Sequence, residues 1–247
     1  MSKLAGRVAI VTGGSKGIGK QIVVDLEKQG AKVYSLSATT GMAIEDFSEA
    51  SSLNQRIVQV KCDITKENEV NQVFQFIKTN ENTLDILINN AGVEYDERIG
   101  MLSASHSNDM INVNLMAPIR LTEKAFKMMM RRKSGVILNI TSVVGEIGNE
   151  GQSVYSATKG GLIAFTKSSA KELSRFGIRV NAVSPGLVDT GMFKEANSDY
   201  MEKRISAIKL GRMGQTKDIS NMIVFLCMDE ASYVTGQVIR VDGLSVF

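Results

Sequence analysis

The sequence predicts an α/β fold with an open parallel β-sheet of about seven strands and helices on both faces. Short β-branched apolar runs alternate with longer amphipathic stretches from one end of the chain to the other. Strands that are apolar throughout are typical of a sheet covered on both faces, and right-handed crossovers through the intervening helices make it doubly wound. The expected strands are Val8–Thr12, Ala31–Leu36, Arg56–Lys61, Leu84–Asn89, Val136–Thr141, Ile178–Val183 and Gln237–Val241.

The stretches between these strands have helical periodicity. No repeat, low-complexity segment or linker interrupts the alternation, so we expect residues 1–247 to form a single domain. The least regular segment, Leu187–Gln215, follows the sixth strand, and we interpret its part Gly191–Lys209 as a mobile flap that selects the substrate. The expected helices are Ile18–Gln29, Glu67–Lys78, Met110–Arg132, Val154–Phe176 and Lys217–Met228.

Composition excludes several classes of function. The chain has 43% apolar and 22% charged residues, and its formal charge of +3 is too small to indicate a nucleic-acid partner. No apolar run has membrane-spanning length, and no signal-peptide core follows Met1. We expect a cytoplasmic protein with Cys62 and Cys227 as buried free thiols, a disulfide being the alternative. His106 is the only histidine and no ligand cluster accompanies it, so no metal is expected.

A glycine-rich segment, Thr12-Gly-Gly-Ser-Lys-Gly-Ile-Gly19, joins the first strand to the first helix. Glycines allow a sharp turn and close approach of the backbone to a pyrophosphate, and the helix N-terminus then faces the phosphates with free N–H groups. A glycine-rich turn alone is a weak signal, but this strand–loop–helix context is the one that a Rossmann dinucleotide site requires. The predicted cofactor contacts in this loop are Gly13, Ser15, Lys16, Gly17, Ile18 and Gly19.

The end of the second strand decides which dinucleotide is expected. Sites for NAD place an acidic residue there to bind the ribose 2′-hydroxyl, but residues 34–40 contain none. Lys16 supplies a positive charge, and Ser37 and Thr39 supply hydroxyl donors for a 2′-phosphate. The alternative is that Lys16 is only solvated. The sequence therefore favours NADP(H).

A candidate catalytic pair, Tyr155 and Lys159, opens the helix after the fifth strand. Residues four apart share one helix face, so an ammonium beside the phenol is predicted to lower its pKa toward the working range of an acid/base. Ser142 follows the fifth strand at the sheet edge where parallel sheets bind ligands, and is predicted to hold the substrate oxygen. A Tyr-x-x-x-Lys pair also occurs by chance, and its position in a chain with a dinucleotide loop is what makes it informative.

Taken together, these motifs resemble those of the short-chain dehydrogenase/reductase family over the whole chain. The matching elements are Thr12-Gly13-x-x-x-Gly17-x-Gly19, Asp63, Asn89-Asn90-Ala91-Gly92, Asn114, Ser142, Tyr155-x-x-x-Lys159 and Pro185-Gly186 with Thr190. The resemblance implies that Asn114 anchors a water that links Lys159 to solvent. It also implies cofactor contacts by Asp63, Ile64, Asn90, Ala91, Gly92, Tyr155, Lys159, Pro185, Gly186, Val188 and Thr190.

Within that family the chain is most similar to the β-ketoacyl-[acyl-carrier-protein] reductases. The similarity lies in residues 142–149, 151–155, 210–214 and 233–236, whereas Thr39–Asn54 and Asp242-Gly243-Leu244 depart from their pattern. The resemblance implies NADPH-dependent reduction of a 3-oxoacyl thioester in fatty acid synthesis, with Tyr155 as general acid. It also implies a homotetramer built on the helices around Met110–Arg132 and Val154–Phe176 and on the C-terminal strand.

Basic residues at the ends of two predicted helices suggest a partner. Arg131, Arg132 and Arg175 are predicted to form a patch near the cleft that docks acyl carrier protein, as such residues do in the family; solvated cations at helix C-termini are the alternative. Two other functions stay open: a short-chain dehydrogenase for a sugar, polyol, diketone or steroid, and a non-catalytic dinucleotide-binding sensor or structural subunit.

Overall fold

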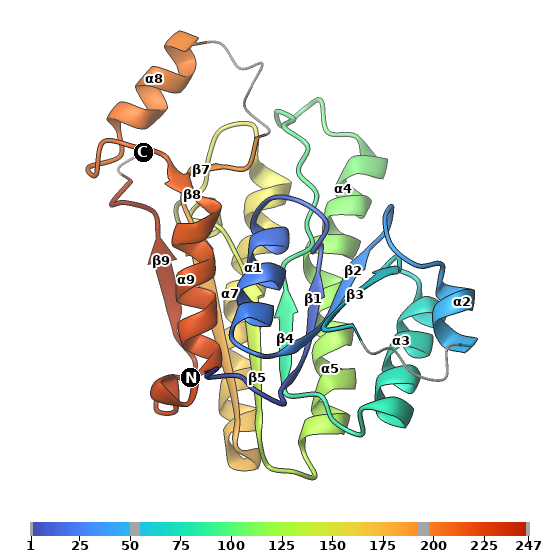
Figure 1. The fold of residues 1–247 in the computed structure, drawn as a ribbon. Helices are drawn as coiled ribbons and strands as arrows, with labels where there is room; N and C mark the ends of the chain where they lie inside the picture. Colours follow the sequence, from blue (N-terminus) through green and yellow to red (C-terminus); the bar gives the residue numbers. More distant parts are fainter. Residues whose placement is uncertain (1, 50–54, 192–197, 246–247) are drawn as a thin grey trace.

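The computed structural model describes residues 2–49, 55–191 and 198–245. Seven parallel strands form one sheet in the order β3-β2-β1-β4-β5-β6-β9 (Figure 1). The order reverses between β1 and β4, so a crevice opens at the carboxyl ends of these two strands. The strands are β1 Val8–Thr12, β2 Lys32–Ser37, β3 Ile57–Lys61, β4 Ile86–Asn89, β5 Gly135–Ile140, β6 Ile178–Pro185 and β9 Val238–Val241.

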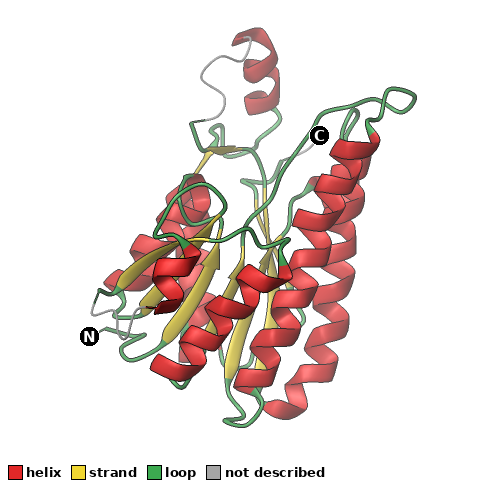
Figure 2. Ribbon diagram, turned by 90° about the vertical axis from the view of Figure 1, so that its right-hand side faces the viewer, coloured by secondary structure: helices red, strands yellow, loops and turns green. Residues whose placement is uncertain are grey.

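Helices cover both faces of this sheet (Figure 2). Alternate residues of β1 point to opposite faces: Ala9 and Val11 pack with α1 and α9, whereas Val8 and Ile10 pack with α3, α5 and α7. The predicted doubly wound fold is thus confirmed. The helices are α1 Gly17–Lys28, α2 Ile44–Glu49, α3 Glu67–Asn80, α4 Ala104–Ile111, α5 Ala117–Met129, α6 Val144–Ile147, α7 Ser153–Leu173, α8 Ser198–Ser206 and α9 Thr216–Cys227.

The predicted strands are confirmed to within two residues at each end, but one predicted helix is wrong in detail. The helix expected from Met110 begins at Ala104, where the Ser103 side chain caps it, and it passes through a π-helical turn at Asn112–Met116 before α5. Pro118 explains the irregularity, because it has no N–H to donate to the carbonyl of Asn114 four residues earlier. The sequence pattern also missed the short helices α2 and α6.

The segment interpreted as a flap contains regular structure. The two-residue strands β7 (Val188–Asp189) and β8 (Gly214–Gln215) pair in parallel, and α8 stands above the carboxyl edge of the sheet (Figures 1 and 2). Residues 192–197 of this segment lie outside the described part. Its motion therefore stays a prediction.

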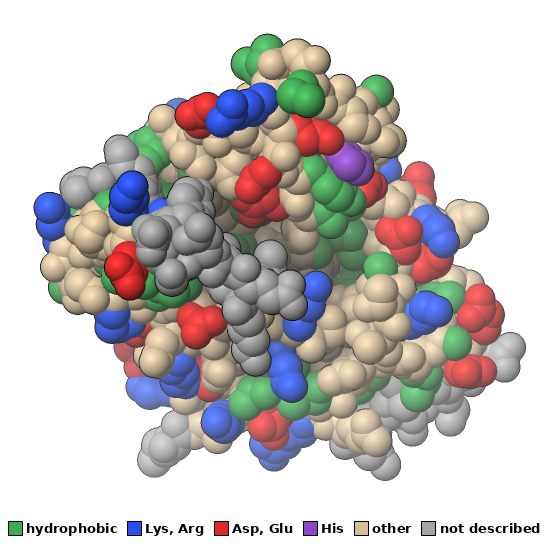
Figure 3. Space-filling model, turned by 90° about the horizontal axis from the view of Figure 1, so that it is seen from above, with side chains coloured by type: hydrophobic (Ala, Val, Ile, Leu, Met, Phe, Trp, Pro, Cys, Tyr) green, Lys and Arg blue, Asp and Glu red, His purple; other side chains and the backbone are tan. Residues whose placement is uncertain are grey.

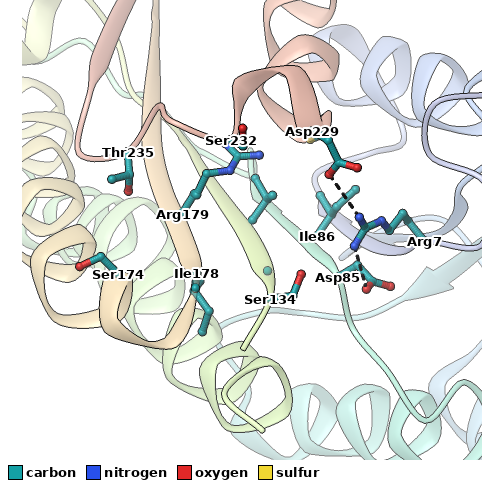
Figure 4. Close-up of a pocket in the computed structure, with 14 residues that line it drawn as sticks. Arg7, Asp85, Ile86, Ser134, Ser174, Ile178, Arg179, Asp229, Ser232 and Thr235 are labelled. Atoms are coloured by element: carbon teal, nitrogen blue, oxygen red, sulfur yellow. Dashed lines mark hydrogen bonds and ion pairs between the residues drawn. The ribbon is translucent and has the colours of Figure 1, made fainter. Parts of the chain in front are cut away.

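Two features lie away from the carboxyl edge. Cys62 and Cys227 are both buried free thiols, as predicted. At the amino ends of β4, β5 and β6 there is a polar cavity of about 320 Å³, in which Arg7 lies between Asp85 and Asp229 (Figure 4). These charges pair with one another, which indicates a structural role. No helix among the described residues is long and apolar enough to span a bilayer.

Candidate active site

The glycine loop is fitted closely against the segment that follows β4. The Thr12 hydroxyl accepts hydrogen bonds from the backbone N–H groups of Asn90 and Ala91, each at 3.0 Å. The Asn90 amide donates to the carbonyls of Thr12 (2.9 Å) and Gly13 (3.2 Å). A Cβ at Gly19 would lie 2.1 Å from the Gly13 oxygen. Only glycine fits there, and the Asn90 side chain holds the loop.

Helix α1 presents an uncapped N-terminus to this loop. Its N-cap residue is Lys16, whose extended backbone leads into the helix without any side-chain capping bond. Its first N–H groups therefore lack a side-chain acceptor, and the positive end of the helix dipole is directed at the crevice. These donors suit a pyrophosphate. Across the loop, a Cβ at Gly17 would lie 3.5 Å from Thr190, which brings the predicted residues Pro185–Thr190 to the same crevice.

A cluster of hydroxyls marks the carboxyl end of β2. The Ser37 hydroxyl donates to Ser15 at 3.1 Å and lies 3.4 Å from the Thr39 hydroxyl and 3.0 Å from that of Thr40. Lys16, which follows Ser15 in the glycine loop, is exposed. Thr40 was missed by the sequence analysis because the chain turns sharply after β2. The cluster offers neutral donors and one cation to an anion.

Two predicted residues, Asp63 and Ile64, follow the end of β3 and make different contacts. Asp63 shapes the turn into α3, since its Oδ1 accepts from the Thr65 N–H (3.0 Å) and hydroxyl (2.7 Å). The Ile64 side chain is buried in the core. The N–H of Cys62 donates to the Ser37 carbonyl at 2.8 Å, so Asp63 follows directly beside the hydroxyl cluster.

Tyr155 and Ser142 meet at the carboxyl edge of the sheet, and Lys159 lies behind them. The Ser142 hydroxyl lies close enough to the Tyr155 phenol to lower its pKa. The Lys159 Nζ lies 5.6 Å from the centre of the Tyr155 ring and donates to the Ile140 carbonyl at 2.9 Å. Lys159 is only 4% exposed, so its ammonium is a buried charge. The three predicted side chains therefore share one site.

The expected effect of Lys159 on the phenol is wrong for this structure. Burial, together with the Glu94 carboxylate, raises the pKa of Tyr155 well above its ordinary value, and only the Ser142 hydroxyl offsets this substantially. Burial lowers the pKa of Lys159 to about 8, although Glu94 opposes that shift. Desolvation outweighs attraction between the two groups because Lys159 is buried and Tyr155 is partly buried. Tyr155 is therefore a protonated phenol at neutral pH.

Asn114 lies in the π-helical turn and is fully buried. Its amide exchanges two 2.8 Å hydrogen bonds with the backbone of Val93 and donates to the Thr158 hydroxyl at 3.3 Å. A Cβ at Gly92 would lie 3.3 Å from the Asn114 Oδ1 and 3.5 Å from the Lys159 Nζ. Glycine at 92 thus leaves space between Asn114 and Lys159, the place where the family resemblance puts a water.

Three residues in this region, Glu94, Asp96 and Gln152, were not among the predicted site residues. Gln152, which is 7% exposed, donates from its Nε2 to the Glu94 carboxylate and to Asp96 Oδ1 (3.0 Å). These contacts join residues 56 to 58 positions apart, so no local sequence pattern reveals them. Seen from above, acidic side chains gather beside the hollow at this edge (Figure 3). Among the described residues, no cluster suits a metal ion.

The predicted basic patch is not near the catalytic residues of the same chain. Arg131 and Arg132 precede the amino end of β5, and Arg175 follows α7, about 30 Å along that helix from Tyr155. A Cβ at Gly177 would lie 2.1 Å from the Lys133 oxygen, so the two turns do adjoin. Arg132 is engaged with Asp85 at 3.2 Å. The turns that carry these cations therefore adjoin at the edge of the sheet opposite Tyr155.

Known proteins resemble the chain along almost its whole length. A family model described as enoyl-(acyl carrier protein) reductase matches residues 13–243. The 3-oxoacyl-[acyl-carrier-protein] reductase FabG of Aquifex aeolicus is 37% identical over 243 residues, 98% of each chain. Proteins of the same name from Staphylococcus aureus strain N315 and Escherichia coli strain K12 are 37% and 36% identical, over 95% and 96% of this chain and 96% of their own lengths. The chain belongs to the short-chain dehydrogenase/reductase family of nicotinamide-dependent oxidoreductases.

Proposed function

We propose that this protein reduces 3-oxoacyl thioesters carried on acyl carrier protein to 3-hydroxyacyl thioesters, with NADPH, in fatty acid synthesis. The observation that carries the proposal is the grouping of Ser142, Tyr155 and Lys159 at the edge of the sheet where the glycine loop also opens. Relatives that bear the name of this activity cover nearly the whole chain. A bound nicotinamide supplies the hydride for the carbonyl carbon.

The side chains are assigned to the other half of the reaction, protonation of oxygen. The Ser142 hydroxyl donates to the substrate carbonyl oxygen and holds it against Tyr155. As the carbonyl becomes an alkoxide, a much stronger base than phenolate, the Tyr155 hydroxyl gives up its proton. The Lys159 ammonium then stabilises the phenolate, whose ring centre lies 5.6 Å away. The phenol is protonated before the reaction, and because its raised pKa makes it a weaker acid, the proton transfer depends on the stronger basicity of the alkoxide and on the Lys159 charge.

The crevice residues are assigned to the cofactor. The uncapped α1 N-terminus would hold the pyrophosphate, and Ser15, Ser37, Thr39 and Thr40 would donate to the 2′-phosphate of NADPH with Lys16 supplying charge. The absence of a carboxylate in residues 34–40 removes the repulsion that an NAD-type site would exert. Asn114 would anchor the water that returns a proton to Tyr155 through Lys159.

A substrate panel tests the reaction. Acetoacetyl and crotonyl thioesters, each on acyl carrier protein and on a small thiol, are to be assayed with NADPH and NADH. The crotonyl arm matters because the family model's description names enoyl reduction. We expect turnover of acetoacetyl thioesters, preferentially with NADPH. Reduction of crotonyl thioesters alone, or of none of these thioesters, would refute the assignment.

The assembly proposed for this enzyme is a cytoplasmic homotetramer. Arg131 and Arg175 lie too far from Tyr155 of their own chain to guide a carrier to it, so docking there would serve the site of a neighbouring subunit. Arg131→Glu is then expected to weaken turnover of carrier-linked substrate more than that of a small thioester. Equal effects on both substrates would remove the docking surface from the proposal.

A further inference from the structure

Glu94 is a charged residue of the catalytic cleft that the reaction described above does not use. It follows Val93, whose N–H and carbonyl are both bound by the Asn114 amide at 2.8 Å. From the other side, Gln152 donates to the Glu94 carboxylate, and Gln152 is three residues before Tyr155. The backbone N–H of Glu97 donates to the Gly151 carbonyl at 2.7 Å. The segment is therefore fixed along the first turn of the catalytic helix.

The Glu94 carboxylate acts electrostatically on Tyr155 and Lys159. It raises the pKa of both groups. The Glu94 side chain is open to solvent, but its pKa is raised because of partial desolvation and the neighbouring carboxylate of Asp96. Lys159, and Arg204 of α8, lower the pKa of Glu94 and so oppose part of this rise. These three are the charged groups that face Glu94 from its own segment, from α7 and from α8. A substrate whose carbonyl oxygen contacts Ser142 and Tyr155 would therefore place a charge on its neighbouring atoms near Glu94. The Glu94 carboxylate would repel that charge if it were negative.

We propose that Glu94 sets the charge selectivity of this cleft, admitting neutral 3-oxoacyl esters and thioesters and disfavouring free 3-oxo carboxylates. The inference rests on the proposed function, because it assumes a 3-oxo substrate. In a 3-oxo acid the carboxylate is two bonds from the ketone carbon, so it enters the cleft with Glu94. At an effective dielectric of about 20, repulsion between two carboxylates in one cleft, partly offset by the cations Lys159 and Arg204, weakens binding on the order of 10-fold.

The test compares substrates that differ only in charge. Acetoacetate, ethyl acetoacetate and a small acetoacetyl thioester are assayed with NADPH and the full-length protein. Glu94→Gln removes the charge, Glu94→Asp keeps it, and Glu150→Gln removes an exposed carboxylate that pairs with Arg98 at 3.3 Å. We expect Glu94→Gln to raise kcat/KM for acetoacetate about 10-fold relative to the neutral substrates. Glu94→Asp and Glu150→Gln should preserve the wild-type ratio.

The deciding quantity is the ratio of kcat/KM for acetoacetate to kcat/KM for the neutral substrates. A ratio that is unchanged in Glu94→Gln, or that changes equally in Glu150→Gln, overturns the charge selectivity. Because folding damage would affect all substrates alike, the ratio reports on charge even if overall activity falls. The wild-type preference should also shrink at 1 M salt, where the Debye length is about 3 Å. If the wild type reduces ethyl acetoacetate but no thioester, the proposed function fails while the selectivity is still measured.

Discussion

The buried ammonium of Lys159 is expected to lower the stability of the folded protein. Replacing Lys159 with an apolar residue should therefore stabilise the chain. Its Nζ is buried without a carboxylate in hydrogen-bond contact, and burial lowers its pKa from 10.5 to about 8. A lysine whose pKa is depressed on folding costs stability at every pH where the same group is protonated in the unfolded chain. The cost is complete below pH 8 and disappears as pH rises through 10.5.

The size of the effect follows from that shift. At pH 7 the difference between 10.5 and about 8 corresponds to about 3 kcal/mol of unfolding free energy. Lys159→Met removes this cost and also the hydrogen bond to the Ile140 carbonyl, which contributes about 1 kcal/mol. The variant should therefore be about 2 kcal/mol more stable than wild type at pH 7. At pH 10.5 the advantage should vanish.

Urea unfolding of the cofactor-free protein at pH 7, 8.5 and 10.5 measures this difference. Lys167→Met is the matched control, because Lys167 is exposed on the same helix. Titrations elsewhere in the protein cancel in the comparison. If Lys159→Met destabilises the protein at pH 7, or if its effect is the same at all three pH values, the argument about a buried ammonium is refuted.

Three further predictions concern the cofactor site and the opposite edge. Lys16→Glu should raise the KM for NADPH at least 10-fold more than that for NADH, as steady-state kinetics would measure; equal changes would mean that Lys16 does not bind the 2′-phosphate. Gly19→Ala should weaken NADPH binding at least 10-fold in a fluorescence titration, because the added Cβ would lie 2.1 Å from the Gly13 oxygen; unchanged affinity would contradict the close fit. Asp85→Asn should cost about 3 kcal/mol of unfolding free energy, since buried Asp85 accepts from the Val8 N–H at 2.9 Å and pairs with Arg7 and Arg132; a loss below 1 kcal/mol would show these contacts to be weak.

The sheet and the position of the site could be predicted from the sequence because both depend on local patterns. Val8–Thr12 is apolar throughout and leads directly into glycines, so β1 and its loop are found at the expected residues. The helix expected from Met110 was misplaced because periodicity does not reveal a π-helical turn, although Pro118 was the available signal.

Long-range contacts and burial account for the rest. Gln152 and Glu94 are 58 residues apart, and only the folded chain brings them together. The pKa of Tyr155 was expected to fall because spacing reveals its neighbour Lys159, but spacing does not reveal the burial of Lys159, the partial burial of Tyr155 or the carboxylate of Glu94. The basic patch was placed at the wrong edge because a long helix carries Arg175 about 30 Å from Tyr155.

The central claim, that Tyr155 gives the proton to the substrate oxygen, is tested most directly by Tyr155→Phe. The assay measures single-turnover oxidation of NADPH with an acetoacetyl thioester, together with the NADPH dissociation constant. Loss of one hydroxyl should lower the rate about 1,000-fold while cofactor affinity stays within about threefold. A variant that retains a tenth or more of the wild-type rate with intact cofactor binding would contradict the role assigned to Tyr155.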